Sequence, residues 1–94
     1  MTKSDLIQEL THRQPDMSQR DVELAVGLLQ KTIVRELAEG GRVEIRGFGS
    51  FSVNHRPARR GRNPKTGAPV DIPEKYVPHF KPGKALAQRV DNDE

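Results

Sequence analysis

Residues 55–73, HRPARRGRNPKTGAPVDIP, most constrain what this chain can fold into, because they cannot enter a packed core. Four prolines exclude a central β-strand, and no large apolar side chain occurs between Arg56 and Pro69. The rest of the 94-residue chain is small: 22 residues are Leu, Ile, Val or Phe, and no cysteine can form a disulfide. We therefore predict that a partner chain completes the fold.

The positive charge is concentrated around the same segment. From Arg42 to Lys84, ten Lys or Arg residues stand against three acidic residues, which gives a local charge of +7. The two flanks carry six bases and ten acids, a charge of −4, so the whole chain has only +3. A basic module on a neutral-to-acidic scaffold indicates a polyanionic partner such as a nucleic acid.

Two helices are predicted before this module. A Thr-x-x-Asp start at Thr2 begins a helix that ends near Arg13, and SQRD at 18–21 begins a long helix that runs to about Glu39. The apolar surface of the long helix is wider than the apolar stripe of an ordinary amphipathic helix, so we expect part of this surface to face a second subunit. The residues expected in the dimer core are Leu29, Ile33, Phe48, Phe51 and Phe80.

The period of the apolar residues changes from 3.6 to 2 in RVEIRGFGSFSVNH, residues 42–55. This alternation around a Gly-Phe-Gly turn predicts a hairpin with one apolar and one polar face, and KYVPHF predicts a third antiparallel strand with Val77 in the core. The polar face presents Arg42, Glu44 and Arg46 in a row. Such a row is either a solvated sheet face or a ligand surface.

The segment 55–73 is then predicted to leave the body as an arm. NPKTG has the composition of a turn, with Pro64 presetting φ and Gly67 tolerating a positive φ, and flanks of similar length can pair as a two-stranded ribbon. The alternative is that these 19 residues form a disordered loop. Both interpretations hold if the ribbon is mobile in the free protein and becomes ordered on binding. The arm has five cations, Arg56, Arg59, Arg60, Arg62 and Lys65, which suit phosphates and a narrow minor groove.

Pro64 has two possible roles at the tip. It either shapes the turn alone, or it enters a base step and kinks a duplex. After the arm, KPGKALAQRV predicts a short helix over 82–90 with Pro82 in its first turn, and Lys81 and Lys84 flank the end where backbone N–H groups favour a phosphate.

The predicted fold class is α+β: a dimer of N-terminal helical hairpins, a three-stranded antiparallel sheet, a long β-ribbon arm and a short C-terminal helix; the family resemblance described below implies that the dimer is intertwined and that its ligand is DNA. One nucleic-acid-binding domain spans 1–94, divided into a helical dimerisation body (1–41), the sheet (42–54 and 74–81), the arm (55–73), the helix (82–90) and an acidic tail (91–94). No apolar run is long enough to span a membrane, so we expect a cytoplasmic protein.

Catalysis is not expected from this sequence. The three histidines are scattered, there is no cysteine, and no nucleophile has a recognisable setting. We expect no metal, cofactor or small-molecule substrate. An RNA-binding arm stays open as an alternative, although RNA modules often display stacking aromatic residues and the basic region has Tyr76 alone outside the predicted core.

The motifs RVEIRGFGSFSV, GRNPKTG and YVPHFKPGKAL together resemble the bacterial HU and integration host factor family of DNA-bending proteins, and most resemble its integration host factor beta chains. The resemblance is colinear from MTKSDLI to about Val90. It implies a dimer, of identical chains or with a related alpha subunit, whose arms embrace double-stranded DNA in the nucleoid. It also implies roles in nucleoid organisation, recombination, replication and transcription control.

For single positions, the resemblance implies that Pro64 intercalates and that the Arg42, Glu44 and Arg46 row contributes to sequence preference. That row favours a sequence-preferring subunit; an HU-like homodimer with little preference is the alternative. Residues implied to line the minor groove are Arg59, Arg60, Arg62, Asn63 and Lys65, and those implied to contact phosphates are Lys3, Lys81, Gly83 and Lys84. Arg60 and the acidic tail depart from the family pattern.

Overall fold

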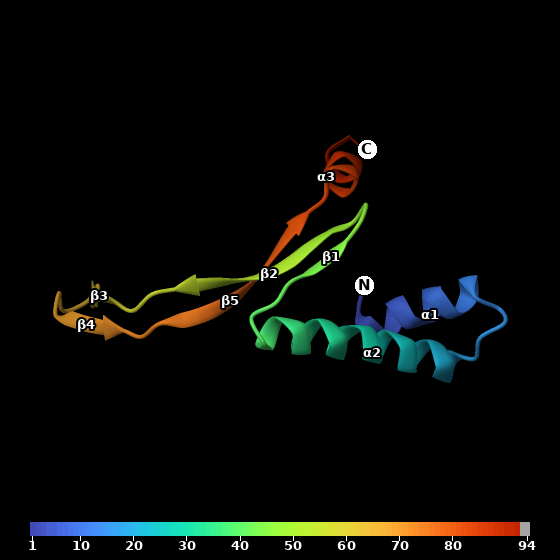
Figure 1. Ribbon diagram of the computed structural model, residues 1–94, viewed down its shortest axis with the longest axis horizontal. Helices are drawn as coiled ribbons and strands as arrows, with labels where there is room; N and C mark the ends of the chain where they lie inside the picture. The colour runs from blue at the N-terminus through green and yellow to red at the C-terminus, as the bar shows by residue number, and fades with distance from the viewer. Residues whose placement is uncertain (93–94) are drawn as a thin grey trace. The chain divides into compact units, whose positions relative to one another are not determined.

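The computed structural model describes residues 1–92 and divides into two units, Met1–Arg35 and the chain from Glu36 onward (Figure 1). The elements, in chain order, are α1 (Lys3–Arg13), α2 (Gln19–Ala38), β1 (Val43–Ile45), β2 (Gly49–Arg56), β3 (Arg59–Arg62), β4 (Pro69–Ile72), β5 (Lys75–Pro82) and α3 (Lys84–Asn92).

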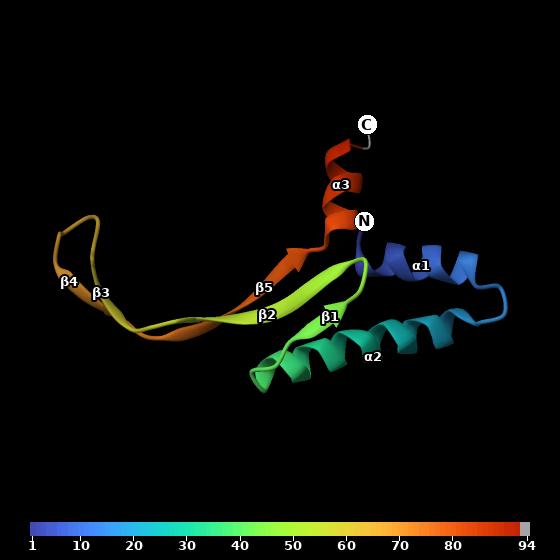
Figure 2. The same ribbon diagram turned by 45° about the horizontal axis from the view of Figure 1, so that its top comes forward.

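The first unit is a helical hairpin in which α1 and the first turns of α2 run antiparallel, side by side in both views (Figures 1 and 2). A capping box begins α1: the Thr2 hydroxyl accepts a hydrogen bond from the Asp5 N–H at 3.3 Å, and the Asp5 carboxylate accepts one from the Thr2 N–H at 2.9 Å. Ser18 caps the start of α2, where its hydroxyl accepts from the Asp21 N–H at 3.1 Å. Both predicted helix starts are confirmed.

Little apolar surface of this unit is buried within one chain. Ile7 and Val22 are the buried apolar side chains among the described residues. On α2, Leu29 is 55% exposed, Leu28 is 67% exposed, and Ile33, also expected in a dimer core, is half-buried. A single chain therefore leaves much of the wide apolar surface of α2 open to solvent.

The end of α2 follows from two glycines, as expected. The Gly41 N–H donates to the Glu36 carbonyl at 2.9 Å and the Gly40 N–H donates to the Leu37 carbonyl at 3.0 Å. Gly40 has a φ of +83°, which closes the helix in a Schellman-type turn. The chain is thereby redirected into β1.

The second unit contains a three-stranded antiparallel sheet in the order β1-β2-β5, which confirms the predicted α+β class. Its apolar side is an aromatic cluster: the Phe80 ring lies 5.4 Å from the Phe48 ring and 4.8 Å from the Phe51 ring, measured between centroids. Gly49 is buried beneath the Phe80 ring. Phe48 itself is 43% exposed, so this cluster also remains incomplete within one chain.

The arm is a paired ribbon that extends away from the three-stranded sheet (Figures 1 and 2). The β2–β5 ladder continues to the pair Arg56–Lys75, beyond the predicted sheet boundary at residue 54. Pairing then stops for two residues in each strand and resumes in β3–β4, from Arg59–Ile72 to Arg62–Pro69. Prolines at 57 and 73 occupy this interruption, because they cannot donate to a ladder.

The C-terminal helix begins later than expected. Pro82 ends β5 and pairs with Gly49, so its predicted place in the first turn of a helix is wrong. Helix α3 begins at Lys84 and continues to Asn92, past the predicted end at residue 90. The predicted acidic tail, 91–94, is therefore helical at its first two positions, and residues 93–94 lie outside the described residues.

Candidate nucleic-acid interface

The polar side of the sheet forms one surface that leads from β1 to the root of the arm. Residues directly opposite each other in an antiparallel pair project to the same side. Glu44 is opposite Ser50, and Ser50 is opposite Lys81, so these three share the side that faces away from the aromatic cluster. The same side continues through the cross-strand pairs Ser52–His79, Asn54–Val77 and Arg56–Lys75.

Val77 is thus placed differently from our expectation. It is half-buried, but its partner is Asn54, and it lies on the side opposite Phe51 and Phe80. The prediction that Val77 belongs to the aromatic core is wrong. The residues of β5 that face the apolar side are offset by one position from those expected with Val77 in the core. Pro78, opposite Val53, therefore lies on the apolar side in place of Val77.

Two groups of sequence-predicted residues meet at the start of α3. One cleft is lined by residues from both groups, namely Arg42, Glu44, Arg46, Lys81, Gly83 and Lys84. Four of these six residues are cationic, and the charge of Arg42 is partly offset by Glu44, whose carboxylate lies 3.8 Å away. The cleft is therefore suited to an anion that spans the β1–β2 turn and the helix start.

Gly83 joins the two sides of this cleft through its backbone. Its N–H donates to the Phe48 carbonyl at 2.8 Å, and its own carbonyl accepts from the Ala87 N–H at 3.0 Å as the first hydrogen bond of α3. A side chain at this position would lie 3.3 Å from the Phe48 backbone. The Gly83 N–H is thus already bonded, and the helix N–H groups that follow it are the ones directed outward.

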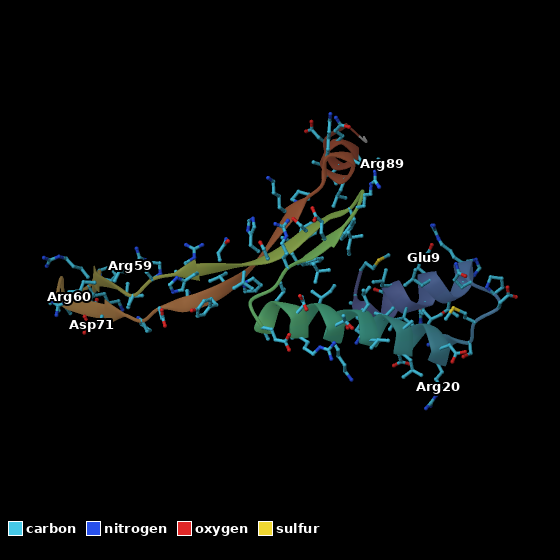
Figure 3. The ribbon with its side chains drawn as sticks, in the orientation of Figure 1. Glu9, Arg20, Arg59, Arg60, Asp71 and Arg89 are labelled. Carbon is cyan, nitrogen blue, oxygen red and sulfur yellow. The ribbon has the colours of Figure 1, made fainter. Side chains whose placement is uncertain are left out.

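The distal arm has two unlike faces, which Figure 3 shows at Arg59, Arg60 and Asp71. One face carries Arg60 and Asp71, whose atoms Nε and Oδ1 lie 3.2 Å apart, and Arg62. The other carries Arg59, Val70 and Ile72, with the Ile72 side chain lying over Gly61. The ribbon therefore presents cations on both sides and apolar surface on one.

The tip is an ordered turn. The Asn63 side-chain oxygen accepts from the N–H groups of Lys65 at 2.8 Å and Thr66 at 3.4 Å. The Asn63 backbone accepts from Gly67 at 2.7 Å and donates to Ala68 at 2.9 Å, with Gly67 at a φ of +73°. Pro64 follows Asn63 directly, so its ring is held at the outer end of the arm by bonds made by its neighbours.

A further bond braces the tip. Arg62 donates from Nη1 to the Gly67 carbonyl at 3.0 Å, which ties one strand end to the returning one. Asn63 and Arg62, both expected to contact a groove, thus also hold the turn together. Lys65, by contrast, is exposed at the tip.

Lys3 belongs to the first unit, where it is the exposed first residue of α1. Its expected role as a phosphate contact rests on the resemblance alone. In the first unit, the pKa of Asp5 lies below its ordinary value of 3.8 because the backbone N–H of Thr2, and then its hydroxyl, bind the carboxylate.

Two charged partners were missed by the sequence reasoning. Asp71 was counted only as an acid near the arm, whereas it pairs with Arg60; Arg60 lies three residues before the NPKTG turn and Asp71 four residues after it, a nearly equal spacing that could have revealed this pair. His55 was described only as one of three scattered histidines, whereas its Nε2 lies 2.9 Å from the Glu74 carboxylate and its ring stacks on the Tyr76 ring at 4.8 Å between centroids.

Neither a metal centre nor a membrane segment is found in the described part of the chain. Residues 1–92 contain no group of three or more His, Cys, Asp or Glu residues that could hold a metal ion. No helix among them is long and apolar enough to cross a membrane.

Comparison with known proteins identifies the family. The bacterial DNA-binding protein family matches residues 1–91. Integration host factor subunit beta of Halorhodospira halophila is 59% identical over 98% of this chain and 90% of its own length, and that of Xylella fastidiosa is 60% identical over 96% and 86%.

Solved structures agree with the sequence relatives. A cocrystal structure of Anabaena HU with DNA superposes with a TM-score of 0.86 at 32% identity, covering 98% of this chain and 99% of that one. HU from Thermotoga maritima superposes with a TM-score of 0.67 at 33% identity, covering 96% and 98%. The ordered basic arm, the cationic cleft and these full-length matches lead to one conclusion: the chain belongs to the bacterial DNA-binding protein family of HU and integration host factor.

Proposed function

We propose that this chain is an architectural DNA-binding protein that bends duplex DNA, acting as the beta subunit of integration host factor. The observation that carries the proposal is the ordered tip, in which Pro64 is held at the outer end of a cationic ribbon. Its role is binding rather than catalysis, in the nucleoid of the cytoplasm. There it serves nucleoid organisation, recombination, replication and transcription control.

The arm reaches DNA through the minor groove. That groove is only about 6 Å wide in B-form DNA, too narrow for an undistorted two-stranded ribbon. The Pro64 ring is compact and apolar, so it can enter a base step, unstack it and open the groove at a cost of a few kcal/mol. Contacts of the arm with the groove then come from Arg56, Arg59, Arg60, Arg62, Asn63 and Lys65.

Bending brings flanking DNA onto the body. The cleft of Arg42, Arg46, Lys81 and Lys84 then contacts phosphates, with the start of α3 contributing backbone N–H groups. Lys3 contacts a phosphate in the same complex. Selectivity comes partly from the deformability of the bent steps and partly from the Arg42, Glu44 and Arg46 row.

A second subunit completes the fold. The apolar side chains that a single chain leaves exposed include Leu24, Leu28, Leu29 and Val34 on α2, and Phe48. Together they expose more apolar surface than a monomer of this size normally does. We infer a dimer in which these surfaces meet, with an identical chain or a related alpha subunit as the partner. The mass of the purified chain in solution distinguishes a stable homodimer from a chain that needs the alpha subunit.

The arm hypothesis is tested with the variants Pro64→Ala and Pro69→Ala. We expect Pro64→Ala to lose most of the DNA bending that energy transfer between the ends of a labelled duplex reports. Pro69→Ala removes a proline that lies behind the turn, in the ladder pair with Arg62, and should bend DNA as the wild type does. Full bending by Pro64→Ala would overturn the wedge.

The alternative function is an HU-like protein with little sequence preference. Equal affinities of a stable homodimer for a candidate specific site and for random DNA would establish it. Competition between bent duplex DNA and structured RNA addresses the remaining RNA-binding possibility, which neither the sequence relatives nor the solved structures favour.

A further inference from the structure

The root of the arm is the point where its backbone pairing is interrupted. The β2–β5 ladder ends at Arg56–Lys75, and the β3–β4 ladder begins at Arg59–Ile72. Between them, residues 57–58 and 73–74 make no ladder pair within the described residues. Since ladder hydrogen bonds do not fix the ribbon here, side chains at the root have a large influence on the direction in which the arm leaves the sheet.

Three side chains occupy one side of this root. The His55 Nε2 lies 2.9 Å from a carboxylate oxygen of Glu74, within the unpaired segment, and the His55 ring stacks on the Tyr76 ring with centroids 4.8 Å apart and planes 29° apart. His55 and Tyr76 are directly opposite in the ladder. They continue, toward the arm, the side of the sheet that carries Phe51 and Phe80.

The opposite side of the root carries like charges. Arg56 and Lys75 are direct cross-strand partners on the polar side of the sheet, and like charges at such a pair destabilise the strand pairing. The contact of His55 with Glu74 lies on the back of the same root. It links the last paired residues of the sheet to the unpaired segment, where the repulsion between Arg56 and Lys75 would open the ribbon.

We propose that His55, Glu74 and Tyr76 form a brace that fixes the angle of the arm and so acts as a positioning element for DNA bending. The inference rests on the proposed function, because it concerns how far the arm bends DNA. None of the three needs to touch DNA. They act through the arm that carries Arg59 and Pro64.

Protonation of His55 strengthens the brace, since the hydrogen bond to Glu74 then becomes an ion pair, and histidine is the side chain that changes charge between pH 5 and 8. The titratable and charged groups at the root lie on both sides of the sheet and come from several elements. They are Arg56 on β2, Arg59 on β3, Glu74 before β5, and Lys75 and Tyr76 on β5.

The test measures energy transfer across an end-labelled duplex at saturating protein, at about pH 6 and about pH 8. At saturation all of the duplex is bound, so the measured energy transfer reports the bend in the complex and does not depend on the affinity. His55→Phe keeps an aromatic ring for Tyr76 and removes the bond to Glu74, while Glu74→Gln keeps a hydrogen-bonding group and removes the charge. Because both partners are exposed, we expect each variant to weaken binding roughly two- to fivefold and to bend DNA less at saturation.

The pH profile adds a readout that a merely structural role would not affect. The wild type should bend DNA more at the lower pH, and both variants should lose this increment. The double variant should behave like either single variant, because the two residues act through one contact. His12→Gln, which removes a histidine from α1, is the matched control and should retain the wild-type profile.

The outcomes separate the two proposals. Variants that bend DNA as the wild type does at both pH values overturn the brace and leave the proposed function intact. A wild type that binds DNA without bending it overturns the proposed function. Should His55→Phe fail to fold, as judged by circular dichroism, Glu74→Gln, an exposed and nearly isosteric change, decides the matter alone.

Discussion

Arg60 and Asp71 face each other across the distal arm, with the guanidinium Nε 3.2 Å from the carboxylate Oδ1, and both side chains largely exposed. One of the five arm cations is therefore neutralised within the free protein. In the proposed complex with DNA, a phosphate would compete with Asp71 for Arg60, and Asp71 would thus limit the strength of the arm's nonspecific binding.

Asp71→Asn should consequently raise the affinity for random duplex DNA, about two- to fivefold at low salt, because an exposed ion pair is worth less than about 1 kcal/mol. The dependence of log affinity on log salt should become steeper, as more phosphate charge is neutralised. Fluorescence anisotropy over a salt series measures both. Asp16→Asn, the same charge change between α1 and α2, is the control, and an equal effect there would indicate a general charge effect.

The Asn63 side chain is predicted to maintain the tip. Asn63→Ala removes the acceptor that binds the N–H groups of Lys65 and Thr66, a loss of about 1 kcal/mol for the turn. Hydrogen exchange at those two amides should accelerate, and DNA bending should fall. Asn63→Asp keeps the acceptor and adds a negative charge, so it should protect the amides yet bind DNA more weakly. Equal protection in Asn63→Ala would contradict this role.

Gly49 and Gly27 should respond oppositely to alanine. A Cβ at Gly49 would lie 2.6 Å from the Phe80 ring and 2.7 Å from the Lys81 carbonyl, so Gly49→Ala should destabilise the fold by about 1–3 kcal/mol. A Cβ at Gly27, within α2, meets nothing within 4 Å, so Gly27→Ala should stabilise it by about 0.5–1 kcal/mol. Urea denaturation at one fixed protein concentration compares them, since dimer stability depends on concentration.

Acid stability should depend on Asp5. Its pKa lies below the ordinary value of 3.8 because the Thr2 N–H and hydroxyl bind the carboxylate, so its contribution is present above about pH 4 and is lost as the pH falls through the lowered pKa. Asp5→Asn should lower the urea midpoint at neutral pH and flatten its decline below about pH 4. Asp16→Asn should preserve the decline. A variant at Asp5 with an unchanged acid profile would show that the capping box contributes nothing.

Most elements of this fold could be predicted from the sequence because each has a local physical cause. The side chains of Thr2 and Ser18 cap the starts of the two helices, and Gly40 ends the second helix by adopting a positive φ. The turn at Asn63 was predicted from the same kind of chemistry. In all of these, the residues that determine the structure lie within five positions of one another.

Errors arose where the outcome depends on pairing between distant residues. Val77 was assigned to the core because it is apolar, but the register of β5 is set by Phe80 opposite Phe51, which places Val77 on the polar side. Pro82 suits a helix start by composition, yet pairing with Gly49 retains it in the strand. Side-chain contacts between distant residues, such as that of His55 with Glu74, likewise cannot be read from a sequence before the strand register is known.

The interruption at residues 57–58 and 73–74 separates two independent ladders. Adding or removing matched residues in β3 and β4 changes the length of the outer ladder and leaves the register of β2 with β5 untouched. A single insertion in β2 would instead invert every side chain beyond it. One sheet can therefore carry arms of different reach without any change in the strand pairing that holds the sheet together.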